Sequence, residues 1–186
     1  MGRVSQAQAE ENRRRVVDTA SRLFREQGTQ VSVADLMKAA GLTHGAFYKQ
    51  FASKEALVDE ATAHAIDELS QRYAAGLEQY EGRRDDAQRT LIDTYLSAEH
   101  RDNVADGCPV AALATDIART PDDQEARRVY ADGVADFAGF LADDDQDGLA
   151  RLSTLFGALV LSRATKGSPL SEQILAAARV ALTEVD

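Results

Sequence analysis

Residues 33–51 read VADLMKAAGLTHGAFYKQF, and this stretch decides the fold. Its first half predicts a helix, because apolar residues recur at positions 33, 36, 37 and 40, the spacing of one helix face. Gly41 predicts the end of that helix, since glycine adopts positive φ at little steric cost. Thr43 is a candidate N-cap for a second, very short helix over residues 44–49. The stretch therefore predicts two helices joined by a tight turn, a helix-turn-helix unit.

Two polar positions sharpen this prediction. Ser32 and Asp35 form a capping-box pattern at the start of the first helix. Gly45 lies inside the second helix, where glycine costs about 1 kcal/mol relative to alanine. We infer that a bulkier side chain there would block a close approach, such as that of a DNA backbone or base edge. In a helix-turn-helix unit the first helix braces the DNA backbone and the second enters the major groove.

Helical patterns continue on both sides of this stretch. Upstream, apolar positions 16, 20, 23 and 24 form the stripe of an amphipathic helix that ends near Gly28. Downstream, Ser53 is a third cap candidate, for a long helix that runs toward Tyr73 or Leu77. The remaining pattern predicts helices over residues 85–99, 109–119, 120–141, 148–164 and 170–185, with a polar loop from Arg101 to Gly107. We predict an all-α fold of about nine helices and no strand.

The charge of the chain is unevenly distributed. The whole sequence carries a formal net charge of −10, which by itself argues against nucleic-acid binding. Residues 1–52, however, hold eight Lys and Arg against five Asp and Glu, whereas the remainder holds 13 against 26. A basic head on an acidic body can contact DNA with one end only.

Composition excludes several other classes. The single cysteine, Cys108, excludes an internal disulfide, and the three scattered histidines match no metal-ligand spacing, so we expect no metal and no cofactor. No apolar run reaches the ~20 residues of a membrane span, and residues 1–11 lack the apolar core of a signal peptide. We therefore expect a cytoplasmic protein. No nucleophile–base pair or phosphate loop indicates an enzyme.

A family resemblance follows from the pattern V-x-x-L-x-x-x-A-G-L-T-x-G-x-F-Y-x-x-F-x-S-K-E-x-L, which runs from Val33 to Leu57. With the arginine-rich helix before it, this pattern resembles the TetR family of transcriptional regulators over residues 10–57. Beyond Leu57 the likeness is looser, although residues 107–113 resemble a sub-group of these regulators with small-molecule or thiol-linked induction. The resemblance implies a helix-turn-helix DNA-binding domain over residues 1–52 and a helical ligand-binding and dimerisation domain over residues 53–186.

The resemblance also implies a set of DNA-contacting residues. Thr43, His44 and Gly45 would face the bases, with His44 donating to a purine acceptor, and Tyr48 and Lys49 would contact phosphates. Phe47 and Phe51 are expected to face the small core of the head. Phe47 is still included among the expected DNA-binding residues, because it lies on the same short helix as His44 and Tyr48. The expected DNA-binding residues are Ser32, Thr43, His44, Gly45, Phe47, Tyr48, Lys49 and Lys54. Gln50 stands where many relatives have a histidine, which leaves its phosphate contact open.

The larger C-terminal part is expected to bind a small-molecule inducer and a second copy of the chain. Candidate inducer contacts are Leu69, Tyr73, Leu91, Tyr95, Cys108, Leu113 and Phe137. The candidate dimer interface is a four-helix bundle of the last two helices from each subunit, through Leu155, Leu159, Leu161, Ile174, Leu175 and Val180. A homodimer would hold two recognition helices at the spacing of a palindromic operator on double-stranded DNA. Inducer binding would then favour a conformer with the wrong spacing.

Several alternatives stay open at this point. Cys108 is either a small buried hydrophobe or a reactive thiol activated by the helix that follows it, so the inducer could be thiol-reactive. The protein could repress or activate transcription, with repression the expected direction. The rival classes are a small enzyme or ligand-binding helical bundle, and an adaptor that kept the head but lost DNA binding.

Overall fold

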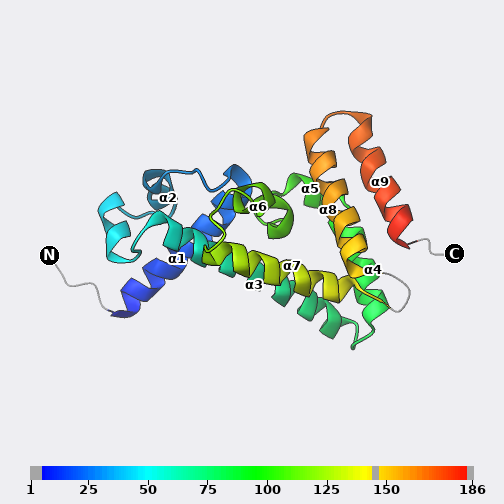
Figure 1. Cartoon of the computed structure of the whole chain (residues 1–186), viewed down its shortest axis with the longest axis horizontal. Coiled ribbons are helices and arrows are strands. Elements are labelled where there is room, and N and C mark those ends of the chain that lie inside the picture. The colour runs from blue at the N-terminus through cyan, green and yellow to red at the C-terminus, as the bar shows by residue number, and fades with distance from the viewer. Residues whose placement is uncertain (1–5, 144–146, 184–186) are drawn as a thin grey trace.

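The computed structural model describes residues 6–143 and 147–183, and within these ranges the chain is helical without a strand. Figure 1 labels the helices in chain order. They are α1 (Gln6–Gln27), α2 (Val33–Ala39), the 3-10 helix η1 (His44–Lys49), α3 (Lys54–Gln79), α4 (Arg84–Tyr95), α5 (Ala98–Asp102), α6 (Pro109–Ile117), α7 (Glu125–Leu141), α8 (Gly148–Ala164) and α9 (Pro169–Thr183). The predicted all-α fold of about nine helices is confirmed.

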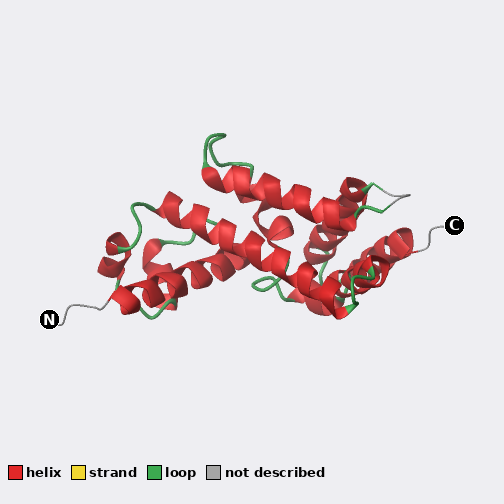
Figure 2. Ribbon diagram, turned by 90° about the horizontal axis from the view of Figure 1, so that it is seen from below, coloured by secondary structure: helices red, strands yellow, loops and turns green. Residues whose placement is uncertain are grey.

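The helices form a head and a body (Figure 1). The head gathers α1, α2 and η1 at the N-terminal end of the molecule. At the far end α8 and α9 pack against each other as a hairpin, next to α4. Between the two ends α3 and α7 lie side by side, as the perpendicular view in Figure 2 also shows. These two long helices are therefore the main mechanical connection between head and body.

Two hydrophobic cores hold the molecule together. The first fills the head and includes Phe24, Leu36 and Phe47, each at most 1% exposed. This core continues beyond residue 52 into α3 and α6, where Leu57 and Leu113 pack into it. The second core fills the body between α3, α4, α7, α8 and α9. Because α3 contributes to both cores, the head is packed onto the body and not merely tethered to it.

The glycine at the helix-turn-helix corner adopts the expected conformation. Gly41 has φ +69°, a value that glycine reaches without steric strain. The next residue closes the turn, because the Leu42 N–H donates to the carbonyl oxygen of Met37 at 2.8 Å. This reversal directs the chain from α2 into η1, as the sequence predicts.

Two predicted helices begin or end elsewhere. The expected helix over residues 85–99 stops at Tyr95, because the Ser97 hydroxyl accepts a hydrogen bond from the His100 N–H at 3.1 Å and starts α5. The loop expected from Arg101 therefore begins after Asp102. Similarly, α7 starts at Glu125 and not at Thr120, since Asp59 on α3 accepts from the Ala126 N–H at 2.8 Å. A distant side chain thus sets that helix start.

The C-terminal end of the chain is described up to Thr183. The last predicted helix, over residues 170–185, corresponds to α9, and Val185 lies outside the described residues. None of the helices in the described ranges combines the length and apolarity that a membrane crossing requires.

Candidate functional site

The helix-turn-helix presents a polar and aromatic row on η1. Thr43, His44, Gly45, Tyr48 and Lys49 are all exposed. Tyr48 is 65% exposed, and its ring meets Phe47 and His44 edge-on at centroid distances of 5.1 and 5.9 Å. A large aromatic side chain held in this open position is available to a partner.

The structure corrects the prediction that Phe47 contacts DNA. Its side chain is fully buried and stacks on Phe51 with the ring centroids 5.4 Å apart. A DNA contact by this side chain is therefore wrong. The phenylalanine instead fastens η1 to the head core, which fixes the direction in which the neighbouring Tyr48 points.

Thr43 differs from the cap that the sequence predicts. Its backbone is extended, as an N-cap requires, and its carbonyl accepts from the Ala46 N–H at 2.9 Å. Its hydroxyl, however, makes no capping hydrogen bond. A six-residue 3-10 helix places few backbone donors near the cap side chain. The exposed hydroxyl is thus left to face solvent or a partner.

The two other caps match the prediction. Ser32 accepts from the Asp35 N–H at 3.1 Å and donates to its carboxylate at 2.6 Å. Ser53 accepts from the Ala56 N–H at 3.2 Å, so α3 begins at the neighbouring Lys54. DNA contacts by Ser32 and Lys54 stay predictions.

Arg13 has a structural role that the sequence did not reveal. Its guanidinium donates to the Gln50 carbonyl and to the Glu60 carboxylate, and lies 4.3 Å from the centre of the Phe51 ring. Arg13 thereby ties α1 to the end of η1 and to α3. The only sequence signal was an arginine on an otherwise solvated helix face.

The comparison with protein families agrees with this geometry. The family model described as "Bacterial regulatory proteins, tetR family" matches residues 16–61, which contain most of α1, all of α2 and η1, and the start of α3. Residues 16–61 therefore match the TetR family of bacterial regulatory proteins.

Individual relatives resemble different extents of this chain. The HTH-type transcriptional regulator AcrR of Shigella flexneri is 38% identical over 79 residues, 40% of this chain and 37% of that protein. The HTH-type transcriptional repressor KstR2 of Rhodococcus jostii (strain RHA1) is 38% identical over 71 residues, 36% of this chain and 35% of that protein. The similarity thus spans little more than a third of either relative. Among solved structures, the reduced form of E. coli NemR aligns with a TM-score of 0.77 at 18% identity, covering 93% of this chain and 95% of that chain. This likeness establishes a shared fold.

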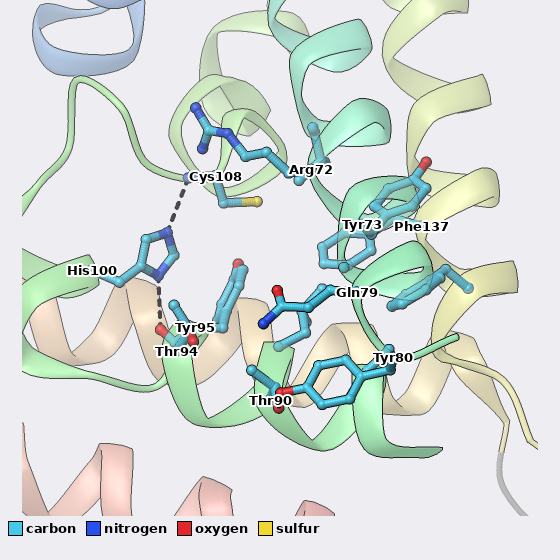
Figure 3. Close-up of a pocket in the computed structure, with 15 residues that line it drawn as sticks. Arg72, Tyr73, Gln79, Tyr80, Thr90, Thr94, Tyr95, His100, Cys108 and Phe137 are labelled. Carbon is cyan, nitrogen blue, oxygen red and sulfur yellow. Dashed lines mark hydrogen bonds between the residues drawn. The ribbon is translucent and has the colours of Figure 1, made fainter. Parts of the chain in front are cut away.

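A cavity of about 240 Å³ lies in the body, among α3, α4 and α7 (Figure 3). Six of the seven predicted inducer contacts line it: Leu69, Tyr73, Leu91, Tyr95, Cys108 and Phe137. The prediction for the seventh residue, Leu113, is wrong, because its side chain is buried in the head core. The fold therefore brings side chains from four helices and a loop around one space.

The cavity has an aromatic wall. The Tyr73 ring stacks between Phe137 and Phe140, with centroid distances of 5.9 and 4.9 Å and interplanar angles of 8° and 22°. Further round the cavity the Tyr80 hydroxyl lies 2.7 Å from that of Thr90. A wall of parallel rings favours a flat, apolar guest.

Next to this wall the cavity has a polar part. Tyr95 is 6% exposed, its ring lies 6.3 Å from that of Phe137, and its hydroxyl has the Cys108 thiol as its side-chain partner. Figure 3 shows this hydroxyl directed toward Cys108. Burial raises the pKa of Tyr95 and also that of Cys108, so both groups keep their protons near neutral pH. Cys108 is therefore a thiol and not a thiolate in this environment.

His100 connects this end of the cavity to the start of α6. One ring nitrogen, Nδ1, lies 2.7 Å from the Tyr95 carbonyl, and the other, Nε2, accepts from the Cys108 N–H at 3.2 Å. A carbonyl only accepts, so the proton is on Nδ1 and the ring is neutral. Burial lowers the pKa of His100, which agrees with this assignment. Neither His100 nor Arg72, which also lines the cavity, was predicted from the sequence.

The segment before α6 joins the cavity to the head. Asp106 pairs with Arg22 of α1, and its carbonyl accepts from Arg72 of the cavity at 2.7 Å. The neighbouring Gly107 carbonyl accepts from Arg25 of α1 at 3.3 Å. Residues 106–108, here called the linking segment, therefore contact cavity residues on one side and α1 on the other.

A cluster of three possible metal ligands lies at the seam of α1 and α3. Asp18, His64 and Glu68 each offer one donor atom, and these atoms lie within 4.8 Å of one another. Glu68, however, also accepts from Arg25 at 3.1 Å, and Arg25 is 4% exposed. A buried guanidinium so close would repel a divalent cation. We assign the cluster to an ion-pair network that holds α1 on α3.

The structure corrects three of the six predicted dimer contacts on α8 and α9. Leu155, Leu159 and Leu175 are at most 3% exposed and belong to the chain's own body core. Their place in a dimer interface is wrong, because each already packs within one subunit. Leu161 and Val180 are 56% and 50% exposed, and Ile174 is half-buried. Among the described residues, five of the six exposed large hydrophobic side chains lie on α8 and α9: Leu149, Val160, Leu161, Leu170 and Val180.

Proposed function

We propose that this protein is a homodimeric repressor that binds palindromic operator DNA through η1 and leaves it when a small molecule occupies the body cavity. The observation that carries the proposal is the exposed row of Thr43, His44, Gly45, Tyr48 and Lys49. A hydroxyl, an imidazole, a phenol and an ammonium group are suited to base edges and phosphates. The excess positive charge of residues 1–52 supports the same face. Repressor names among the relatives support the direction of control.

The proposed dimer forms through the outer face of α8 and α9. Monomeric proteins rarely expose so many large apolar side chains on one hairpin, and a second copy would cover them. This hairpin lies at the end of the molecule opposite the head. Two heads would thus stand apart on a common side and meet successive major grooves, which requires a spacing of about 34–36 Å.

The proposed inducer effect runs through the linking segment. A guest in the cavity would disturb Arg72 or His100, both of which hold residues 106–108. The same residues contact Arg22 and Arg25 of α1, so their displacement would reorient the head. A ligand shifts such an equilibrium only by its difference in affinity for the two states.

The inducer is proposed to act reversibly. A thiol-reactive inducer would need Cys108 as thiolate, whereas burial raises the pKa of this thiol. The cysteine lines the cavity as a small apolar group with a weak donor. Action on chromosomal DNA would place the protein in the cytoplasm.

The test is a gel-shift assay with the upstream intergenic DNA of the protein's own gene. Wild-type protein should give a sequence-selective shift that weakens as salt rises. Tyr48→Ala should weaken binding strongly, while Tyr48→Phe separates the contribution of the hydroxyl from that of the ring. Both variants should remain dimeric by light scattering. Absence of a selective shift at moderate salt, or normal DNA binding by Tyr48→Ala, would contradict the proposal.

A further inference from the structure

The residues that line the body cavity indicate which class of small molecule it would bind. It has an aromatic wall and, beside it, a set of hydrogen-bond donors (Figure 3). Building on the proposed function, we infer that the inducer is a small, flat aromatic carboxylate, with its ring against Tyr73 and Phe140 and its carboxylate between Arg72 and Tyr95.

The size and shape of the cavity limit the apolar part of the guest. Its volume of about 240 Å³ lies below the ~300–1,000 Å³ typical of pockets for drug-sized ligands. The half-buried rings of Tyr73 and Phe140 offer faces and edges for stacking, and Phe137, which is 0% exposed, packs against Tyr73. One or two fused aromatic rings fit this space and this wall.

The charge of the lining selects an anion. None of the described residues that line the cavity is acidic, whereas Arg72 brings a guanidinium. Arg72 forms no ion pair within the described parts of the chain, and its one recorded hydrogen bond goes to the Asp106 carbonyl. Its other N–H donors are therefore free to bind a carboxylate, which accepts two parallel hydrogen bonds from arginine.

The buried Tyr95 hydroxyl completes the polar end. It is protonated, has only the Cys108 thiol as a side-chain partner, and points to the Cys108 end of the cavity where Arg72 also lies. A thiol is a weak acceptor, so a ligand oxygen would give this buried hydroxyl a stronger hydrogen bond. His100 cannot fill this role, because both of its ring nitrogens are already bonded to backbone groups.

This placement also explains how a carboxylate bound in the cavity would affect the head. A carboxylate bound to the free N–H donors of Arg72 is a stronger acceptor than the neutral Asp106 carbonyl, so it would draw the guanidinium toward the cavity. Drawing Arg72 away would loosen the linking segment, which Arg22 and Arg25 of α1 contact from the other side. A neutral guest of the same shape would leave the bond between Arg72 and Asp106 in place.

Four compounds of matched shape test the inference by isothermal titration calorimetry on the full chain. They are 2-naphthoate, its neutral amide 2-naphthamide, the saturated decalin-2-carboxylate, and the cationic 2-naphthylmethylammonium. We expect 2-naphthoate to bind tightest, about tenfold more tightly than the amide, since charge-assisted hydrogen bonds are roughly twice as strong as neutral ones. Loss of stacking should weaken the saturated acid, and Arg72 should repel the cation.

Two arginine variants locate the effect. Arg72→Gln should bring the affinities of 2-naphthoate and 2-naphthamide together, while Arg89→Gln, which alters an exposed arginine on α4 that does not line this cavity, should leave their ratio unchanged. Tyr95→Phe should weaken the acid more than the amide. Binding of the amide or the cation as tight as that of the acid, no binding of any of the four, or an unchanged ratio in Arg72→Gln would overturn the inference. These titrations contain no DNA, so the gel shift fails or succeeds independently of them.

Discussion

The Cys108 N–H donates to Nε2 of His100 at 3.2 Å, and this bond connects the cavity wall on α5 to the start of α6. It exists only while Nε2 is unprotonated, because a protonated imidazole has no acceptor. The Arg72 and Arg163 guanidinium groups nearby also disfavour a positive charge on the ring. One of the two hydrogen bonds between the cavity and the linking segment therefore depends on the protonation state of His100, while the bond from Arg72 to Asp106 does not.

Acid should weaken the fold through His100. Burial lowers its pKa below the ordinary value of 6.5, so at mildly acidic pH the unfolded chain binds a proton that the folded chain does not. Stability then rises with pH across this window and falls as the pH drops below about 6.5. Urea unfolding at pH 7.5 and 5.5 should show a smaller decrease for His100→Gln than for wild type. The control is His44→Gln, which changes an exposed histidine of the head. It should keep the share of the stability decrease that comes from His100. Equal decreases in all three proteins would refute this role.

Gly45 should matter for DNA binding and not for folding. A Cβ atom at this position meets nothing within 4 Å, so the fold does not require glycine there. Gly45→Ala should keep or raise the free energy of unfolding, since alanine favours helix by up to about 1 kcal/mol, and should weaken the operator complex. The matched change Gly133→Ala should lower the free energy of unfolding and leave the DNA-contacting face unchanged. Its Cβ would lie 2.6 Å from Cγ2 of the buried Ile66, and overpacking of this kind costs about 1–3 kcal/mol. A Gly45→Ala protein with wild-type affinity for DNA would rule out a close approach at this glycine.

The head was largely predictable from the sequence because its signals are local. Ser32, Gly41 and Ser53 act on residues within a few positions of themselves, and the structure confirms the two serine caps and the turn. Thr43 was harder, because its cap depends on whether η1 forms an α-helix or a 3-10 helix. The burial of Phe47 also follows from helix periodicity, which conflicts with its inclusion among DNA contacts.

The body was less predictable because its contacts join distant residues. Periodicity identified Tyr73, Tyr95 and Phe137 as apolar-face residues, and these do line the cavity. The same reasoning assigned Leu155 and Leu175 to a dimer interface, because an apolar stripe does not reveal whether its partner is the same chain or another. The Gly107 carbonyl that accepts from Arg25 lies 82 residues away, and the Asp106 carbonyl that accepts from Arg72 lies 34 residues away, so no local pattern encodes these two contacts.

Arg25 and Glu68 should be strongly coupled. Arg25 is 4% exposed and its guanidinium lies 3.1 Å from the Glu68 carboxylate, so removing one partner leaves a poorly solvated charge. A double-mutant cycle with Arg25→Leu and Glu68→Gln, measured by urea unfolding, should give a coupling energy above about 1 kcal/mol. The exposed pair of Arg128 and Glu125, treated in the same way, should give a clearly smaller coupling energy, because water and salt screen it. Similar values for both pairs would mean that burial does not strengthen the first one.

The assignment of the α8 and α9 leucines predicts two different defects. Leu161 is 56% exposed and contributes little to the fold of one subunit, so Leu161→Glu should shift the dimer toward folded monomers in analytical ultracentrifugation. Leu155 is fully buried, so Leu155→Ala should lower the free energy of unfolding by about 2–5 kcal/mol. Circular dichroism should show full helicity for Leu161→Glu, which separates loss of association from loss of structure. A Leu161→Glu protein that sediments as wild type would place the subunit contact elsewhere. Because the proposed operator complex needs both heads, the monomeric variant should also lose most of its affinity for DNA while η1 stays intact.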